Sequence, residues 1–444
     1  MKIILTATFW ISTYLALVLA PLAVLKFGDV PPGSGFWWDF SMALGFAGMA
    51  MMGVQFLLTA RFQRASAPFG IDIIYYFHRY LAVMAFSFIF LHFIIIRIDN
   101  VDALGVINPL HAPWYMTSGR VALLLFALLI VTSLWRKPLR IHYDEWRMLH
   151  ITLAVTAFLL ALGHIEGVGY YIDAPTKHWL WNGYTLFWLL LIVYLRLIKP
   201  WRMSSKPYRV TEVRQERGDS WTLALAPEGH QGLSFKPGQF AWLTLRESPW
   251  HIKEHPFSFS SCADNPNCLE FTIKELGDFT RTIKHTQVGE TAYLDGPYGV
   301  FSIDQHPDAP GFIFIAGGVG AAPIISMLRT LAERQDTRPL WFICANNEWD
   351  KVIFREELES LKQRLNLHLV HVLKQPPAGW PSDNGQCESG VITSALLNNV
   401  LPSETEKYEC FICGPKPMSD TAQQGLHALR VPLAQIHFEL FDMV

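Results

Sequence analysis

Four histidines are spaced so that they could hold metal-bound cofactors inside a membrane. The apolar segment Ile71–Ile96 carries His78 and His92, and a second apolar segment carries His150 and His164. Within each segment the two histidines are fourteen residues apart. On an α-helix this interval returns a side chain to within about 40° of the same face, after a rise of ~21 Å. Ionisable side chains are costly at bilayer depth, so these four indicate a function.

The chemistry follows from how the histidines would pair. If the two segments cross the membrane in the same direction, His78 lies level with His150, and His92 with His164. Two facing imidazole pairs are what two six-coordinate haems require, and such iron transfers electrons rather than activating a ligand. We therefore interpret the histidines as the ligands of two b haems. A single intramembrane histidine more often bridges two helices by a hydrogen bond, and a haem-binding membrane protein without redox activity is the plainer alternative.

Six apolar segments of the length that spans a bilayer must position these ligands. Lys and Arg concentrate in alternate loops, as at Arg136, Lys137 and Arg140, which places both termini in the cytoplasm. Residues 1–202 are therefore predicted to be a six-span transmembrane haem domain in the plasma (cytoplasmic) membrane. The expected spans are Ile3–Leu25, Phe36–Ala60, Ile71–Ile96, Tyr115–Trp135, Trp146–His164 and Trp179–Ile198.

The rest of the chain has the composition of a soluble, acidic body. Up to Arg202 there are 15 Lys and Arg against 9 Asp and Glu, and beyond it there are 21 Lys and Arg against 29 Asp and Glu. Neither part has the strong positive charge that is typical of nucleic-acid-binding proteins. All six cysteines lie beyond Arg202, which fits a reducing compartment without disulfides. Cys410 and Cys413 form a CxxC, but on a strand they face opposite sides, so a shared zinc ion is not expected.

Two subdomains are predicted in this soluble part. Residues 203–308 read as short alternating strands with frequent turns, typical of an antiparallel β-barrel. Residues 309–444 alternate strands with helices, typical of a parallel α/β domain. In the second subdomain the glycines of "GGVGAAP" follow an apolar strand and precede a helix, where backbone N–H groups can bind a phosphate. The sequence departs from GxGxxG, so this signal is only moderately specific.

A family resemblance rests on four motifs that occur in order: HPFS, GDFT, GGVGAAP and CGPKPM. Through them the soluble part resembles flavoproteins of the ferredoxin–NADP reductase type. Together with the six spans and the histidine pairs, nearly the whole chain resembles the ferric reductase and NADPH oxidase superfamily. The resemblance implies a path from NAD(P)H through FAD and the two haems to an acceptor outside the cytoplasm.

The resemblance also implies roles for particular residues. Ser258, Cys413 and Phe441 are implied to lie against the reacting rings: Ser258 at flavin N5, Cys413 beside the nicotinamide, and Phe441 stacked on the flavin. An ordinary core aromatic is the alternative for Phe441. The flavin site is implied to include His255, Pro256, Phe257 and Ser258, and the FAD pyrophosphate site Gly277, Asp278, Phe279 and Thr280. The nicotinamide dinucleotide is implied to contact Gly317, Gly318, Val319, Gly320, Cys413 and Gly414.

The nucleotide and the acceptor stay open at this point. The stretch Ala345–Glu348 offers no cation for a 2′-phosphate, and Glu348 could meet a ribose hydroxyl, which slightly favours NADH over NADPH. The acceptor could be O₂, giving superoxide, or a metal ion such as Fe³⁺. A third possibility is that the chain donates electrons to a separate extracytoplasmic or membrane redox protein.

Overall fold

The computed structural model describes residues 2–26, 35–62, 71–251, 253–378 and 387–439. Phe441, the expected flavin-stacking residue, lies outside them. The chain divides into two compact units, Met1–Trp201 and Arg202–Val444. Each is described here by itself.

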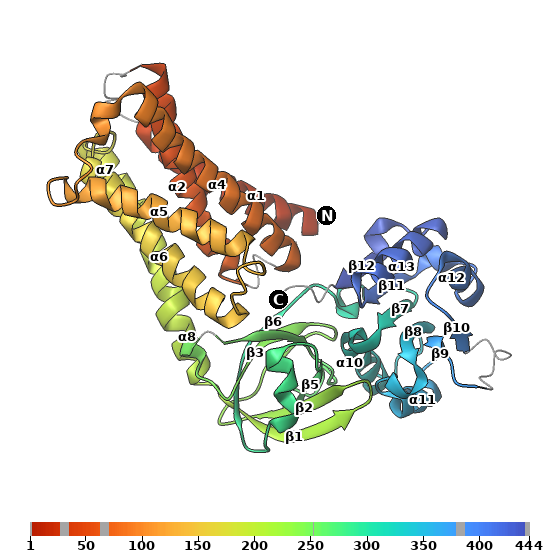
Figure 1. Cartoon of the computed structure of the whole chain (residues 1–444). Coiled ribbons are helices and arrows are strands. Elements are labelled where there is room, and N and C mark those ends of the chain that lie inside the picture. Colours follow the sequence, from red (N-terminus) through yellow and green to blue (C-terminus); the bar gives the residue numbers. More distant parts are fainter. Residues whose placement is uncertain (1, 27–34, 63–70, 252, 379–386, 440–444) are drawn as a thin grey trace. The chain divides into compact units, whose positions relative to one another are not determined.

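The first unit is a bundle of six long helices (Figure 1), each apolar and long enough to cross a membrane, which confirms the predicted six spans. The last helix continues through a π-helical turn, Tyr194–Ile198, into the short helix α8, Lys199–Ser204, and a 3₁₀ turn, Val101–Leu104, follows the third span. The six helices are α1 (Lys2–Lys26), α2 (Phe36–Thr59), α4 (Ile71–Asp99), α5 (Trp114–Leu134), α6 (Tyr143–Val168) and α7 (Pro175–Val193).

The bundle is built from two tightly packed helix pairs, α2 with α4 and α5 with α6, whereas α4 and α6 make few contacts with each other over the described residues. In the first pair, a Cβ on Gly48 would lie 2.8 Å from Ile89 and 3.0 Å from the carbonyl oxygen of Ala85, so only glycine permits this approach. The histidine-bearing helices therefore belong to different pairs.

The second unit begins with an antiparallel sheet that curls into a barrel, as predicted. The strand order is β4-β3-β6-β1-β2-β5, and an antiparallel bridge between Phe259 and Phe271 joins the two edges. A four-residue helix, α9 (Asp278–Arg281), follows β5. The strands are β1 (Tyr208–Glu216), β2 (Ser220–Pro227), β3 (Phe240–Leu245), β4 (His255–Ser258), β5 (Leu269–Lys274) and β6 (Thr291–Tyr298).

The remainder of this unit is the predicted α/β fold, with six parallel strands in the order β10-β9-β8-β7-β11-β12. Helices α10 and α11 pack on one face of the sheet and α12 and α13 on the other. The strands are β7 (Phe312–Gly317), β8 (Leu340–Glu348), β9 (Leu367–Gln375), β10 (Cys387–Ser389), β11 (Glu409–Cys413) and β12 (Ile436–Glu439). The helices are α10 (Ala321–Glu333), α11 (Arg355–Arg364), α12 (Ser394–Val400) and α13 (Lys416–Ala428).

A largely buried arginine, Arg329, joins the barrel to the α/β fold. Arg329 on α10 donates to Glu357 of α11 at 2.6 and 2.8 Å, and to the Ser260 carbonyl of the barrel at 2.7 Å. It also pairs with Glu270 on β5. Only 17% of the Arg329 side chain is exposed. A second ion pair, Arg217 with Glu356, also joins the two folds, but both partners are more exposed, at 37% and 67%.

Replacing Arg329 by methionine should lower the free energy of unfolding of the soluble unit by about 3 kcal/mol, because it leaves carboxylates without their buried partner. Urea denaturation of the full chain, followed by FAD fluorescence, measures this. The matched control is Arg217→Met, which should change stability by less than about 1 kcal/mol because that pair is exposed. An equal decrease in the free energy of unfolding in the two variants would contradict the conclusion that Arg329 is the main link between the barrel and the α/β fold.

Candidate functional site

After the predicted orientation, we call His78 and His150 the inner pair and His92 and His164 the outer pair. The inner pair faces across the bundle. The ring centres of His78 on α4 and His150 on α6 lie 6.2 Å apart. A metal-bound ring nitrogen lies ~2 Å from the metal, so two imidazoles on opposite sides of one ion have their centres roughly 6 Å apart. The Nδ1 atom of His150 lies 3.1 Å from the Ser133 hydroxyl of α5. The pair therefore has the separation that one iron atom between the rings requires.

The outer pair is oriented by neighbouring helices. Nδ1 of His92 lies 2.9 Å from the carbonyl oxygen of Ser41 on α2, and Nδ1 of His164 lies 3.0 Å from that of Tyr115 on α5. A carbonyl oxygen can only accept, so both Nδ1 atoms carry the proton. The lone pair of each ring is therefore on Nε2, as metal ligation through that atom requires.

Two glycines that the sequence analysis did not single out press against these rings. A Cβ on Gly45 would lie 3.3 Å from the ring of His92, and one on Gly119 would lie 2.7 Å from Nδ1 of His164. Neither glycine belongs to a motif. A small residue on a neighbouring helix, three or four positions from the carbonyl that accepts from the histidine, is the only signal that could have identified them.

The four histidines are arranged so that they could act as two pairs of metal ligands. Each imidazole is half-buried, and the helices that carry them are not packed tightly together. Three of the rings have Nδ1 engaged by a neighbour, which leaves Nε2 for a metal. His78, His150, His92 and His164 would thus hold the haems, with each ligand pair drawn from α4 and α6.

In the soluble unit, the HPFS motif forms β4 and pairs antiparallel with β3, with Ser258 opposite Phe240. The Ser258 hydroxyl is buried and has no hydrogen-bond partner within the described part of the chain. A buried hydroxyl without a partner is destabilising, so it suits a polar ligand atom such as the flavin N5. His255, Pro256 and Phe257 lie on the same strand.

The GDFT motif lies against HPFS. The ring of Phe279 stacks on His255 at 3.9 Å between centres and lies 6.0 Å from Phe257. The helix that Gly277 and Asp278 begin has only four residues, so it offers little of the expected helix dipole. In addition, the Thr280 hydroxyl accepts from the backbone N–H groups of Gly277 and Leu276, both at 2.8 Å, so these two are not available to a pyrophosphate in this conformation.

The glycine-rich turn and the CGPKPM motif pack backbone against backbone. Gly317 ends β7, Gly318 has a positive φ of 56°, and α10 follows Gly320. A Cβ on Gly320 would come within 2.2 Å of the Cys413 carbonyl oxygen, and one on Gly414 within 3.0 Å of the Gly317 nitrogen. The two turns therefore lie against each other at the carboxyl ends of β7 and β11, and Met418 and Pro415 pack on Gly317. At Gly318 a Cβ would meet nothing within 4 Å, so this is the open position at which a dinucleotide can approach the backbone; Val319 lies within the same turn.

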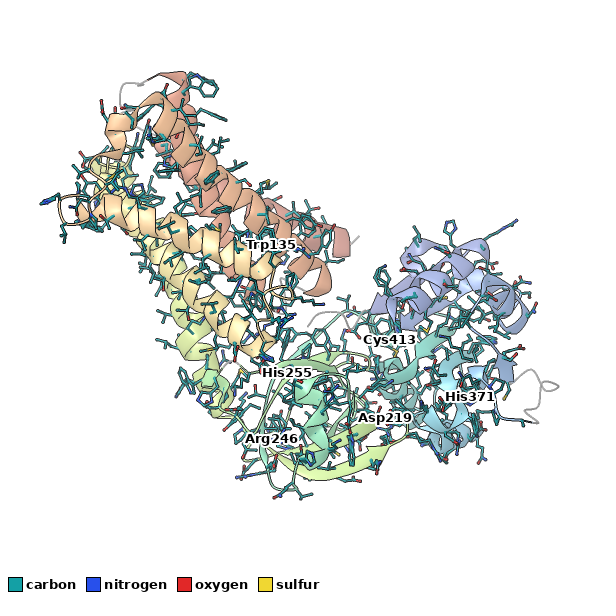
Figure 2. All side chains as sticks on the ribbon, viewed as in Figure 1. Trp135, Asp219, Arg246, His255, His371 and Cys413 are labelled. Carbon is teal, nitrogen blue, oxygen red and sulfur yellow. The ribbon has the colours of Figure 1, made fainter. Side chains whose placement is uncertain are left out.

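A short path of contacts links the position expected for the flavin ring, at Ser258, to the position expected for the nicotinamide ring, at Cys413. Phe240 is paired with Ser258, and its ring lies against Gly299, which is also close to the carboxylate of Glu439. Glu439 in turn is in register with Cys413 on the adjacent strand. Figure 2 marks His255 on the barrel and Cys413 on the α/β sheet. The residues expected at the flavin and at the nicotinamide thus belong to one contiguous region of the second unit.

Cys413 itself is fully buried. Burial, together with the nearby Glu439 carboxylate, raises the pKa of its thiol well above the ordinary value, so the sulfur is a neutral thiol at physiological pH. Cys410 belongs to the core on the opposite face of the sheet. The CxxC residues therefore do not converge on a common ion.

A lysine, Lys351, lies close to the end of β8 and pairs with Glu348. Glu348 pairs with Lys351 at 3.0 Å, and both side chains are nearly half exposed. A lysine next to the expected ribose position removes the argument that this region offers no positive charge for a 2′-phosphate. The structure therefore does not favour NADH over NADPH.

Three protein families match this chain in succession. The ferric reductase like transmembrane component matches residues 44–162, an FAD-binding domain residues 207–302, and an oxidoreductase NAD-binding domain residues 314–424. The chain is thus an integral membrane oxidoreductase with the domain arrangement of ferric reductases and NADPH oxidases.

Relatives match over about half of the chain. The reductase component of propane 2-monooxygenase from Rhodococcus jostii is 30% identical over 241 residues, 52% of this chain and 62% of its own length. The flavohemoprotein of Halalkalibacterium halodurans is 28% identical over 252 residues, 53% of this chain and 60% of its own length. The chain therefore spans less than two thirds of either relative.

Among solved structures, the FAD/NAD-binding domain of nitric oxide dioxygenase from Vibrio cholerae is similar, with 22% identity and a TM-score of 0.46. It covers 53% of this chain and 98% of the other.

Replacing Ser258 by alanine should slow flavin reduction by NAD(P)H about tenfold, the effect of losing one hydrogen bond worth ~1.4 kcal/mol to the reacting ring. Stopped-flow absorbance of the flavin measures the rate. Ser261→Ala is the matched control, because Ser261 lies three residues away and its hydroxyl is also buried without a partner among the described residues. If both variants slow the reaction equally, Ser258 does not contact the flavin.

Replacing Gly119 by alanine should displace His164 and weaken the outer haem while leaving the inner haem bound, because the added methyl would overlap the imidazole. Haem content and the reduced absorption spectrum of the purified chain measure the change. Gly183→Ala is the control, since a Cβ there would meet nothing within 4 Å. Full haem content with an unaltered spectrum in Gly119→Ala would exclude His164 as a ligand.

Proposed function

We propose that this chain carries electrons across a membrane, from cytoplasmic NADH or NADPH by way of FAD and two b haems to an extracytoplasmic acceptor. The observation that supports this most directly is the facing pair His78 and His150, with ring centres 6.2 Å apart, on helices that also carry His92 and His164. A flavin accepts a hydride and releases electrons singly, and a six-coordinate haem accepts one electron at a time.

The residues of the chain position and insulate these groups. His78 and His150 hold one haem, and His92 and His164 hold the other. Ser41 and Tyr115 fix the outer rings by accepting from Nδ1. Large buried side chains fill the interior of the bundle, among them Phe126, Phe158 and Trp188.

In the soluble unit, the residues bring a nicotinamide against a flavin. The Ser258 hydroxyl would donate to the flavin ring, and the neutral thiol of Cys413 lies beside the nicotinamide position. The turn Gly317–Gly320 would admit the dinucleotide close to the backbone at Gly318, and the turn Cys413–Gly414 packs against it. No protein acid, base or nucleophile is needed for this hydride transfer.

The proposed orientation places both termini and the soluble unit in the cytoplasm, in the plasma (cytoplasmic) membrane. It rests on the basic loop between α5 and α6, which contains Arg136, Lys137 and Arg140. All six cysteines lie in the second unit, and a cytoplasmic position would keep them reduced. The acceptor is then outside, either O₂ or a ferric ion.

A second candidate is an electron-donor module for a separate extracytoplasmic or membrane redox protein. The observation that favours it is the similarity to the propane 2-monooxygenase reductase component, a protein named as one component of a larger system. This candidate differs from the first only in the acceptor.

The purified, FAD-supplemented chain should reduce cytochrome c with NADH or NADPH. Loss of the signal on adding superoxide dismutase would identify O₂ as the acceptor. A signal that ignores the dismutase and is matched by reduction of a ferric chelate would identify a reductase. Consumption of nucleotide only after a membrane or periplasmic protein fraction is added would favour the donor module.

Replacing His164 by alanine separates transmembrane transfer from flavin chemistry. The variant should lose the outer haem and at least tenfold of its acceptor reduction, while NAD(P)H still reduces the flavin at the original rate. His111→Ala, in an exposed outer loop, is the control. Unchanged acceptor reduction in His164→Ala would show that electrons leave from the flavin and not through the bundle.

A further inference from the structure

Two histidines and a glutamate converge in the α/β part, away from the site described above. His306 lies in the segment that connects the barrel to β7, Glu409 begins β11, and His437 is the second residue of β12. One ligand atom from each lies within 4.8 Å of the others, and within the described ranges this is the one group of three that does so.

The geometry is that of a ligand set. The Glu409 carboxylate lies between the two imidazoles, with Oε2 2.7 Å from Nε2 of His437 and Oε1 3.5 Å from Nδ1 of His306. The ring centres of the two histidines are 4.3 Å apart. Ligand atoms bound to one first-row metal ion lie roughly 3 to 3.5 Å from each other. Small side-chain rotations would therefore place all three atoms around one ion.

The surroundings hold the three side chains in place. The ring of Phe411 lies 4.9 Å from His437 and 6.1 Å from His306, and it forms an apolar floor below them. The side chains of His306, Glu409 and His437 are 24%, 16% and 21% exposed, so an ion can enter. The nearby Arg338 guanidinium is paired with Asp336 at 2.6 Å, which offsets its repulsion of a cation.

The group is separate from the nucleotide turns. Glu409 is at the amino end of β11 and Cys413 at its carboxyl end. Four residues of strand separate them by ~13 Å. The oxidoreductase chemistry proposed above does not use these three residues.

We propose that His306, Glu409 and His437 form a site for a divalent transition-metal ion of the zinc class. Imidazole nitrogen and carboxylate oxygen are the donors that such ions prefer, and two histidines with one glutamate leave coordination positions for water. The ion would join the connecting segment to the two strands β11 and β12. It would therefore stabilise the α/β fold by an amount that increases with the logarithm of the free ion concentration above the dissociation constant.

The test is zinc binding by the full-length chain, purified without a histidine tag, treated with a chelator and supplied with FAD. Equilibrium dialysis with Zn²⁺ and elemental analysis give the zinc bound per chain, and FAD release on heating gives the stability. His306→Asn, Glu409→Gln and His437→Asn remove the ligands one at a time. His427→Gln, an exposed histidine on α13, is the matched control.

The wild-type and His427→Gln chains should bind zinc with the same affinity and release FAD at a higher temperature when zinc is present. Each ligand variant should bind at least ~10-fold more weakly and lose the temperature shift. The proposal is overturned if the wild type takes up no zinc, or if the three variants bind as the wild type does.

If a ligand variant fails to retain FAD, a measurement on the wild-type chain alone still tests the proposal. Zinc should protect His306 and His437, but not His427, from modification by diethyl pyrocarbonate, as mapped by peptide mass spectrometry. Equal modification of all three histidines with and without zinc would overturn the proposal.

Discussion

A histidine ring inside a bilayer has two nitrogens, and neither can rely on water. In the first unit neighbouring helices meet this constraint for three of the four rings: the carbonyl oxygens of Ser41 and Tyr115 accept from the outer rings, and the Ser133 hydroxyl contacts His150. Nδ1 of His78 is buried without a partner among the described residues. For these contacts to form, α2 must approach α4 and α5 must approach α6. Gly45 and Gly119 allow that approach where any larger side chain would meet the rings. The ligand geometry, the helix pairing and the positions of small residues thus follow from one requirement.

The second unit must hold a dinucleotide and a flavin, and it also depends on segments that pack closely at glycines. A dinucleotide must reach the backbone at the ends of β7 and β11, so the turns there consist largely of glycine and pack directly on each other. The flavin side is built instead from side chains: Phe279 stacks on His255, and the Ser258 hydroxyl stays buried without a partner. Arg329 then joins the barrel to the α/β fold through carboxylates from both. The residues expected at the flavin and those expected at the nicotinamide are thus held in one unit by Arg329, whose ion pairs need carboxylates from both the barrel and the α/β fold.

Much of this could be predicted from sequence because the signals are periodic or local. Apolar length identifies the spans, and the fourteen-residue interval identifies the faces of α4 and α6 on which His78 and His92, and His150 and His164, lie. Strand alternation and turn residues distinguish the barrel from the α/β fold. The remaining features depend on contacts between distant segments. Nothing near Gly119 in the chain indicates that His164 lies against it, and nothing near His306 indicates Glu409 or His437. The contacts of Thr280 are local as well, but the sequence did not indicate that its hydroxyl would accept from the backbone N–H groups of Gly277 and Leu276.

The division of the bundle into two helix pairs has a consequence for how the protein is made. Each pair, α2 with α4 and α5 with α6, packs tightly, whereas over the described residues the two ligand-bearing helices make few contacts with each other. If the histidines hold iron as proposed, every haem takes one ligand from each body. Each haem would then link the two helix pairs directly. Loading the haems would be a step in the maturation of the membrane unit, since it would add a connection between α4 and α6 that side-chain packing scarcely provides.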